Sequence, residues 1–254
     1  MLPDIVASVE QRLPQVIARL DEYKATVTSR RRSFADALAS PGMSVIAEIK
    51  RRSPSRGVLS AGLDPARQAR AYEAGGAASI SVLTERDHFS GSADDLREVR
   101  TAIRLPVLRK DFIIHPAQVW ESLAMGADAI LLIVAILDDA TLGDLYREAS
   151  DIGIPVLVET HTEQEVERAS RLEAEIIGVN NRDLATFDVD LATAERLAPL
   201  IGSSTLKVAE SGIHTPNDAG RMLAAGFDAV LVGESLIKAA DPGRLVSEIS
   251  AVAP

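Results

Sequence analysis

Short apolar stretches rich in Ile, Val and Leu alternate with longer amphipathic stretches from Ser44 almost to the end of this 254-residue chain. Such short apolar runs are typical of parallel strands that are covered on both faces, and the stretches between them have helical spacing. Strands that alternate with helices build a parallel sheet, and eight of them can close into a barrel. The pattern therefore predicts an α/β fold, a (β/α)₈ TIM barrel, with strands over residues 45–49, 79–84, 106–110, 129–134, 155–159, 176–180, 205–210 and 229–233.

Helix start signals support the same order of elements. Thr162 and Glu165 have the spacing of a capping box, and Thr215 precedes Pro216 as an N-cap precedes a proline at the first helical position. No low-complexity linker interrupts the series. Residues 44–254 are therefore predicted to form the barrel, and the whole chain to form one structural domain.

The first 43 residues differ from the rest and are predicted to form a helical extension. Pro14 is expected to split or kink the first helix or to start a second one, and residues 33–39 are expected to add a short helical turn. A segment this short cannot bury a core of its own, so we expect a cap over the floor or rim of the barrel rather than a separate functional module. Apolar residues at helical spacing support the first helix: Ile5, Val9, Leu13, Val16 and Leu20.

Composition and charge limit the function classes. The net charge of −10 and the pI of about 5.0 argue against general binding to nucleic acid or to a membrane surface. The chain has no cysteine, which excludes disulfides and thiolate catalysis. The longest apolar run, residues 129–137, is nine residues long, whereas a membrane span needs about 20. We expect a cytoplasmic protein without a signal peptide, and a monomer or a weak homodimer.

Ionisable side chains stand at the ends of the predicted strands, where the reactive groups of a (β/α)₈ barrel lie. Glu48 and Lys50 share one face of the first strand, which in a barrel is the interior. Burial of ions is costly unless they are paired, so this pair indicates a site; a salt bridge that only fixes the barrel is the alternative. Glu159 and Glu210 end the fifth and seventh predicted strands.

Lys110 ends the third predicted strand and is expected to point inward, with Arg109 and Asp111 pointing outward as an ion pair. A desolvated lysine near other cations holds its proton less tightly and can serve as a general acid. A solvated loop lysine is the alternative. The three strand-end carboxylates are expected to balance three cations in a nearly neutral site: Glu48, Glu159 and Glu210 with Lys50, Lys110 and Arg182.

The last three predicted strands end in groups suited to binding oxygen atoms. An amide and a guanidinium of the same parity fit hydroxyl or carboxylate groups. Glycines after the seventh and eighth strands let backbone N–H groups approach a phosphate, and a short helix over residues 234–239 would add its N-terminus; plain turns are the alternative. The side chain of Glu234 must then turn away. These binding candidates are Asn180, Arg182, Ser211, Gly212, Gly233 and Glu234.

Loops beyond the strands supply further candidates. Ser53 opens a Ser-Pro-Ser-Arg-Gly segment, which is either an ordered lid with hydroxyl donors or a plain surface loop. Phe89 and Phe112 are candidates for contact with an aromatic substrate, whereas Trp120 is expected to pack between helices. No metal ion is expected, because the histidines show no metal-binding pattern: His88, His115, His161 and His214.

In combination, these segments resemble the indole-3-glycerol phosphate synthase family of tryptophan biosynthesis over nearly the whole chain, including the N-terminal extension. Each motif alone is weak, but the set is highly specific. One departure is Glu234, which stands where a small residue is often found. The motifs that carry the resemblance are residues 45–50 (VIAEIK), 53–55 (SPS), 108–112 (LRKDF), 157–159 (LVE), 178–184 (GVNNRDL), 209–212 (AESG) and 232–233 (VG).

The resemblance implies a carboxy-lyase without a cofactor, acting on a phosphorylated small molecule. The implied reaction converts 1-(2-carboxyphenylamino)-1-deoxyribulose 5-phosphate into indole-3-glycerol phosphate, CO₂ and water. It places Lys110 as general acid at the carbonyl oxygen, Glu159 as acid or base in the dehydration, and Glu48 as the residue that orients Lys110. Glu210 joins this catalytic set. Anionic groups and sugar hydroxyls would be held by Lys50, Arg182 and Asn180.

Other enzymes and a non-catalytic barrel are the alternatives. Phosphoribosylanthranilate isomerase and sugar-phosphate epimerases are barrels that bind phosphate, but the former usually uses a cysteine–aspartate pair and the latter paired aspartates or a metal. A Schiff-base enzyme with a nucleophilic lysine and a scaffold protein are further alternatives. Two lysines with two glutamates at strand ends favour the synthase.

Overall fold

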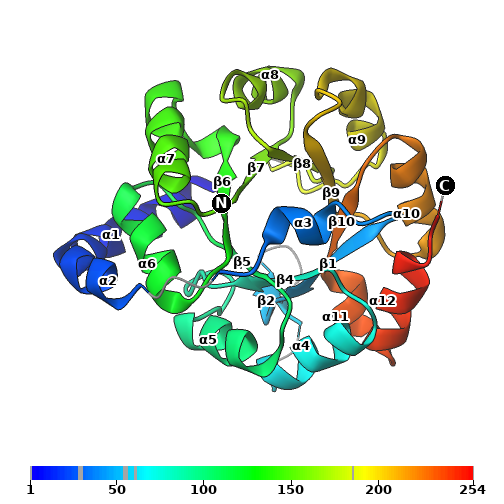
Figure 1. The fold of residues 1–254 in the computed structure, drawn as a ribbon, viewed down its shortest axis with the longest axis horizontal. Coiled ribbons are helices and arrows are strands. Elements are labelled where there is room, and N and C mark those ends of the chain that lie inside the picture. Colours follow the sequence, from blue (N-terminus) through cyan, green and yellow to red (C-terminus); the bar gives the residue numbers. More distant parts are fainter. Residues whose placement is uncertain (1, 28–30, 54–56, 60–61, 185, 254) are drawn as a thin grey trace.

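The computed structural model describes residues 2–27, 31–53, 57–59, 62–184 and 186–253. Within these residues, eight parallel strands close into a barrel in the order β1-β10-β9-β8-β7-β6-β5-β4 (Figure 1). The predicted fold is confirmed, and each predicted strand agrees with the structure to within one residue at either end. The strands are β1 Ser44–Ile49, β4 Ser79–Leu83, β5 Val107–Lys110, β6 Ala129–Ile133, β7 Val156–Thr160, β8 Ile176–Asn180, β9 Leu206–Glu210 and β10 Ala229–Val232.

Helices form a ring around the strands (Figure 1). Most begin at a side-chain cap, as Thr215 does by accepting a hydrogen bond from the backbone N–H of Asp218. Short elements add a hairpin, β2 Arg52–Ser53 with β3 Gly57–Val58, and two 3₁₀ turns, Val134–Ile136 and Ala198–Leu200. The helices of the ring are α4 Pro65–Ala74, α5 Ala93–Ala102, α6 Pro116–Met125, α7 Asp139–Asp151, α8 Glu163–Arg171, α9 Ala192–Leu197, α10 Pro216–Ala224, α11 Glu234–Lys238 and α12 Pro242–Ser250.

Inside the barrel, apolar and ionisable residues form successive layers. Leu108, Leu157 and Val208 belong to the apolar cluster of the interior. Two residues further along each of these strands comes an ionisable side chain with the same direction, because side chains alternate between the faces of a strand. Parallel strands all end at the same end of the barrel, so the ionisable layer lies at that end above a closed apolar core.

The N-terminal extension contains α1 Leu2–Ala18, α2 Leu20–Thr26 and α3 Phe34–Leu38. Pro14 neither splits the first helix nor starts a second one, because α1 continues through Pro14 and the break falls at Arg19. Pro14 lies on the exposed side of α1, where water can hydrate the carbonyl that the missing N–H leaves free. The predicted short helix after Ser33 is confirmed.

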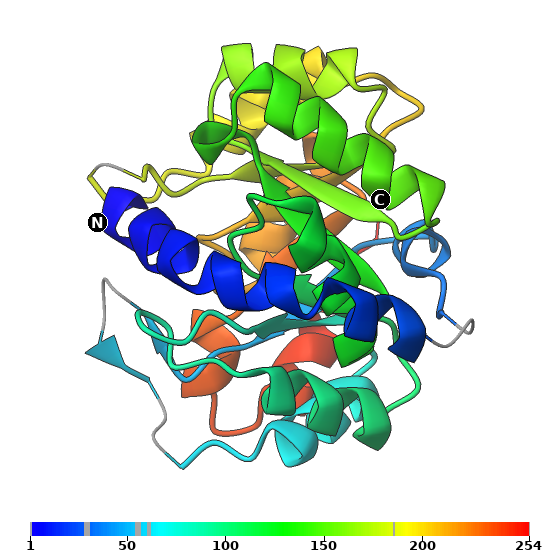
Figure 2. The same ribbon diagram turned by 90° about the vertical axis from the view of Figure 1, so that its left-hand side faces the viewer.

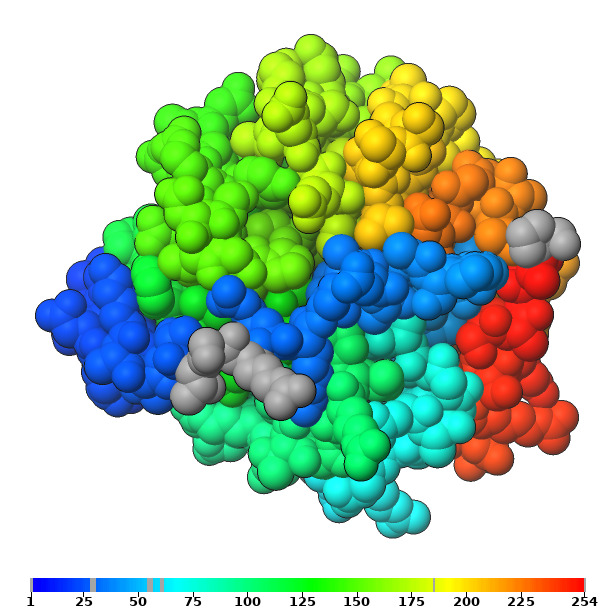
Figure 3. All heavy atoms as spheres, in the orientation of Figure 1, coloured from blue at the N-terminus to red at the C-terminus, as the bar shows by residue number. Residues whose placement is uncertain are grey.

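Both ends of the barrel interior contact this extension. Phe34 and Leu38 of α3 are fully buried in the interior cluster, and α3 crosses the barrel axis in Figures 1 and 3. Ile5 of α1 lines a cavity at the opposite end together with the strand ends. Figure 2 shows the start of α1 and the β2–β3 hairpin at that same end. Among the described residues, no helix combines the length and apolar character needed to cross a membrane.

Outside the strands, buried polar contacts connect β5 to the helices. The expected outward ion pair is confirmed: Arg109 Nη2 lies 2.9 Å from Asp111 Oδ2 and 2.8 Å from Glu121 Oε2 of α6. Trp120 packs between helices, as predicted, since its Nε1 donates to Glu148 of α7 at 2.7 Å and Lys24 of α2 lies over its ring. These contacts hold the Arg109 side chain on the outer face of β5. Because side chains alternate along a strand, Lys110 then points inward.

Candidate active site

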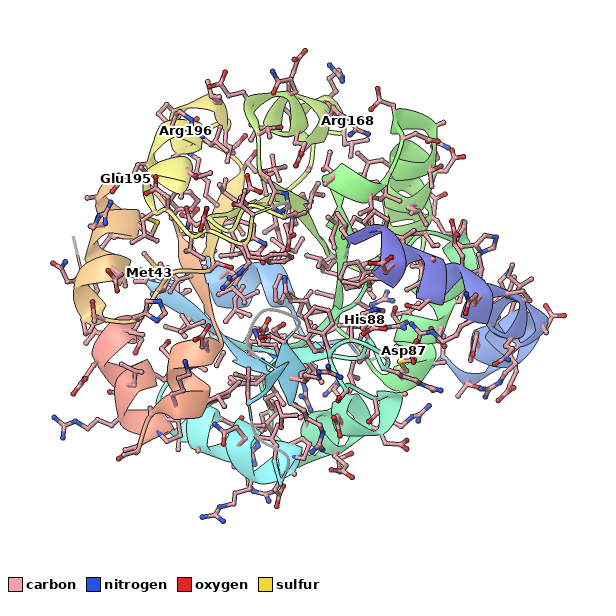
Figure 4. The ribbon with its side chains drawn as sticks, turned by 180° about the vertical axis from the view of Figure 1, so that it is seen from behind. Met43, Asp87, His88, Arg168, Glu195 and Arg196 are labelled. Atoms are coloured by element: carbon pink, nitrogen blue, oxygen red, sulfur yellow. The ribbon has the colours of Figure 1, made fainter. Side chains whose placement is uncertain are left out.

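A cavity of about 420 Å³ opens at the end of the barrel where the strands end. Figure 4 is seen from this end, with the loop of Asp87 and His88 beside α1. The cavity collects side chains from almost every strand, as the barrel fold requires of its functional end. Every predicted site residue lines it: Glu48, Lys50, Ser53, Phe89, Lys110, Phe112, Glu159, Asn180, Arg182, Glu210, Ser211, Gly212, Gly233 and Glu234.

Lys110 lies at the centre of this constellation. Its Nζ donates to Glu159 Oε2 at 2.9 Å and to Glu210 Oε2 at 2.8 Å. Both carboxylates are almost completely buried. Three groups from β5, β7 and β9, far apart in the sequence, therefore form one ionic cluster at the base of the cavity.

The charge on Lys110 differs from the sequence-based expectation. Neighbouring cations were expected to weaken its hold on the proton, and this is wrong for the free protein. Burial lowers the pKa of Lys110, but the carboxylates of Glu159, Glu210 and Glu48 outweigh burial and raise it above its ordinary value. The structure places carboxylates, not cations, nearest to its ammonium group.

Glu159 and Glu210 share this ammonium and titrate as a pair. Burial and the neighbouring Glu159 raise the pKa of Glu210 to about 8, although Lys110 opposes them. Burial would also raise the pKa of Glu159, but Lys110, His161 and Asn180 outweigh it and lower that pKa to about 2. Within the pair, Glu210 therefore holds its proton more tightly, and Glu159 is the group that ionises first.

Glu48 pairs with Lys50 rather than with Lys110. Lys50 Nζ donates to Glu48 Oε1 at 2.5 Å, and Glu48 acts on Lys110 only through its charge. Gly233 permits this arrangement, because a Cβ at this position would lie 2.4 Å from Glu48 Oε1. In the free protein Glu159 and Glu210 make the direct contacts with Lys110, and the role of Glu48 in orienting Lys110 and sharing protons stays a prediction.

Asn180 and Arg182 frame the side of the cavity. The backbone N–H of Arg182 donates to Asn180 Oδ1 at 3.1 Å, and the Arg182 guanidinium donates to the carbonyl of Phe187 at 3.1 Å. Asn181, in contrast, points away and fixes the loop, since it accepts from Ala194 N–H and donates to the carbonyl of Ser211. Asn180 and Arg182, which were predicted to share one face of the chain, both line the cavity.

Two backbone loops after β9 and β10 lie side by side at the rim. Ser211 and Gly212 both have left-handed backbones, with φ of 63° and 82°. Ser235 joins the loops by donating to the carbonyl of Ile213 at 2.9 Å. The predicted short helix begins at Glu234, whose side chain turns away to Lys238 at 2.6 Å, as expected.

An aromatic wall closes the side near α1. The rings of Phe89 and Phe112 are tilted by 35° with centroids 6.0 Å apart. The fully buried Glu85 holds the loop of Phe89 by accepting hydrogen bonds from the backbone N–H groups of Asp87, His88 and Phe89. Ser53 also lines the cavity, while residues 54–56 of the predicted lid lie outside the described residues.

Comparison with known proteins agrees with this geometry. The family model described as indole-3-glycerol phosphate synthase matches residues 2–249. The chain belongs to the indole-3-glycerol phosphate synthase family. It is 48% identical to the indole-3-glycerol phosphate synthase of a Nocardioides species, with 99% of this chain and 98% of that protein covered. The enzymes of that name from Kineococcus radiotolerans and Streptomyces coelicolor (its synthase 1) are 46% and 49% identical, each with 99% of this chain and 95% of the relative covered.

Solved structures share the fold at low sequence identity. The 3-hexulose-6-phosphate synthase of Salmonella typhimurium superimposes with a TM-score of 0.66 at 16% identity, over 82% of this chain and 97% of that one. A thiamine phosphate pyrophosphorylase from Pyrococcus furiosus gives 0.61 at 15% identity, over 85% and 96%. At this sequence identity, the similarity shows a shared barrel fold only.

Three residues of this synthase-family site were missed from the sequence. A Cβ on Gly178 would lie 2.4 Å from Glu210 Oε1, so glycine is needed there. Glu85 supports the aromatic loop, and His161 contacts Glu159 from behind. His161 has the parity of Glu159 two residues earlier, and this signal could have separated it from the other histidines.

Stability should depend on pH through Glu210. Its pKa is raised to about 8 from 4.5, so the unfolded chain loses this proton first and the stability of the protein falls as pH rises through that window. Glu210→Gln removes this loss. The difference in unfolding free energy between Glu210→Gln and the unsubstituted protein should therefore shift in favour of the variant when the pH is raised from 5 to 9. The shift should be on the order of 3 kcal/mol, at about 1.4 kcal/mol for each pKa unit.

Urea unfolding at both pH values measures this gain. Glu167→Gln is the matched control, since Glu167 is an exposed glutamate of α8 paired with Arg171. It should leave the pH dependence unchanged. An equal pH dependence for Glu210→Gln and the unsubstituted protein would contradict the protonation state assigned to Glu210.

Gly233→Ala should damage the site without touching any ionisable residue. The new Cβ overlaps Glu48 Oε1, so Glu48 and its partner Lys50 must move. A displacement of this size in a preorganised site costs on the order of 10²-fold in kcat/KM. Gly143→Ala in α7 is the control, because nothing lies within 4 Å of its added Cβ. Steady-state kinetics should show full activity for the control alone.

Proposed function

We propose that this protein converts 1-(2-carboxyphenylamino)-1-deoxyribulose 5-phosphate into indole-3-glycerol phosphate, CO₂ and water. The observation that carries the proposal is the Lys110 ammonium held between the Glu159 and Glu210 carboxylates in the cavity of a chain from this family. A proton donor and an ionised carboxylate side by side meet the needs of ring closure followed by dehydration.

The cavity offers a separate place for each part of this substrate. The aromatic ring fits against Phe89 and Phe112, whose faces supply apolar contact. The phosphate fits the rim at Gly212 and Gly233, where backbone N–H groups are accessible without an intervening side chain. Lys50 lines the same cavity, paired with Glu48, and can hold an anionic oxygen. The reacting ketone is then directed toward Lys110.

The reaction divides into three steps in this arrangement. The ring carbon that bears the carboxylate attacks the ketone carbon, and Lys110 gives a proton to the ketone oxygen. The C–C bond to the carboxylate then breaks and CO₂ leaves, because its electron pair returns to the cationic ring system. Finally Lys110, reprotonated from solvent, gives a second proton to the hydroxyl, which leaves as water, while Glu159 takes a proton from the carbon next to nitrogen. Arg182 and Asn180 hold anionic and hydroxyl groups of the chain throughout.

Incubation with the carboxyphenylamino substrate tests the proposal, with indole fluorescence as the signal. The expected result is stoichiometric indole-3-glycerol phosphate without added metal or cofactor. The same preparation is offered phosphoribosylanthranilate and a pentulose phosphate as rival substrates, and no turnover is expected. Turnover of either rival without indole formation would overturn the proposal.

The assembly and location stay predictions of the sequence. We propose that the protein is cytoplasmic and is a monomer or a weak homodimer. Light scattering across a concentration series should give the monomer mass at low concentration, with unchanged specific activity. A loss of activity on dilution would show that a second copy is needed.

A further inference from the structure

His161 connects the catalytic cluster to the first turn of α8. Its ring Nε2 lies 3.4 Å from Glu159 Oε1, and its Nδ1 lies 3.1 Å from Glu165 Oε2. Lys110 contacts the other oxygen of Glu159. A line of alternating charges therefore leads from the cavity to the helix: Lys110, Glu159, His161 and Glu165. His161 itself is not one of the described residues that line the cavity.

The start of α8 is built to hold this imidazole. Thr162 caps the helix by accepting from the backbone N–H of Glu165 at 3.2 Å. The second half of the predicted capping box forms differently, since the Glu165 side chain accepts from the backbone N–H of His161 at 2.8 Å. The same oxygen, Glu165 Oε2, also faces His161 Nδ1. One carboxylate thus fixes both the backbone and the ring of His161.

The position of a proton follows from the donor and acceptor inventory. Glu165 is an acceptor, so Nδ1 of His161 carries a hydrogen. The remaining nitrogen, Nε2, is buried and has no hydrogen-bond partner among the described residues, and it faces an oxygen of Glu159. Two acceptors do not face each other in a buried site without a proton between them. Either His161 or Glu159 must therefore carry one more proton.

The surrounding charges decide which group carries it. Glu159 on β7, Glu165 on α8 and Glu210 on β9 act on His161, and Lys110 on β5 stands beyond Glu159. Burial lowers the pKa of His161, but the three carboxylates outweigh burial and raise it. Lys110 favours an ionised Glu159 from the other side. The proton thus resides on the imidazole.

We propose that His161 is a positioning residue that stands as an imidazolium between Glu159 and Glu165, and so keeps Glu159 ionised and fixed through Oε1 while Oε2 faces the reaction. The inference rests on the proposed function only where it makes Glu159 the base of the dehydration. The charge state of His161 is a property of the free protein and can be measured without substrate.

NMR of protein labelled with ¹⁵N-histidine tests the charge state directly. His161 is assigned from the His161→Gln spectrum. Both of its ring nitrogens should be protonated at pH 7.5, and Glu165→Gln should lower its titration midpoint by about one pH unit, since a carboxylate partner is lost. A His161 ring with one protonated nitrogen at this pH, unaffected by Glu165→Gln, would overturn the inference whatever the activity.

Kinetics of His161→Leu test the effect on Glu159. Without the imidazolium, Glu159 should hold its proton to higher pH, so the acid limb of kcat should shift upward by about one unit. KM should change little, because His161 does not contact the cavity. His161→Gln keeps a donor for Oε1 without the charge, and its limb should shift while its thermal stability stays closer to that of the unsubstituted protein.

His115→Leu is the matched control for a structural effect. His115 also lies at the start of a helix, but as the N-cap residue of α6, whereas His161 precedes the N-cap Thr162 of α8, and His115 does not line the cavity. Its loss should lower stability, by about 1 kcal/mol for a cap, without moving the acid limb. If the acid limb of kcat shifts equally in His161→Leu and His115→Leu, or shifts in neither, the assigned role is refuted. Absence of indole formation in the unsubstituted protein would instead refute the proposed function and leave the NMR result decisive.

Discussion

Lys110→Met is expected to lower kcat by at least about 10²-fold at every pH, as for other groups that transfer a proton in the transition state. The variant loses the donor at the ketone oxygen. It also leaves Glu159 and Glu210 buried without their cation, so the pKa of Glu159 should rise and the base of the later step is lost as well. Single-turnover assays of CO₂ release and of indole fluorescence should both fall, because ring closure precedes both signals.

A second substitution of Lys110 and a control variant distinguish proton donation by Lys110 from the effect of its positive charge. Lys110→Arg keeps a cation between the carboxylates but holds its proton too firmly to act as an acid, so it should be stable and inactive. Lys207→Met is the matched control: Lys207 is also a strand lysine, on β9, but its parity is opposite to that of Glu210 and it does not line the cavity. Near-full turnover by Lys110→Arg would show that Lys110 acts only by its charge.

Strand positions and inward directions were predictable because they depend on local patterns. Short apolar runs fix the strands, and the period of two fixes which residues point inward, so Lys110 and Glu159 could be placed in one layer without coordinates. Outward pairing of Arg109 with Asp111 followed from the same parity. The convergence of these residues then needs only that the strands are parallel and close into a barrel.

Contacts between residues of different strands were less predictable. Whether Glu48 reaches Lys50 or Lys110 depends on the stagger between strands, which the apolar pattern does not specify. The error about the charge on Lys110 has the same origin, since its pKa is set by neighbours 49 and 100 residues away. Gly178 escaped notice because its reason lies in the side chain of Glu210 on the adjacent strand.

Glu159→Gln should separate the last step of the reaction from the first two. Glutamine keeps nearly the shape of glutamate, and Lys110 keeps its contact with Glu210, so ring closure and loss of CO₂ should still occur. The carboxylate that takes the proton during dehydration is absent. Steady-state indole formation should therefore fall by about 10²-fold or more, with KM changed far less.

A single turnover with substrate labelled in its carboxyl carbon distinguishes the steps. Excess Glu159→Gln should release close to one equivalent of labelled CO₂ while indole fluorescence lags far behind, because the hydroxylated ring intermediate waits for its proton to be removed. Lys110→Met, assayed in parallel, should release neither. Equal loss of both signals in Glu159→Gln would place Glu159 in ring closure instead, since a group needed only after decarboxylation cannot slow the departure of CO₂.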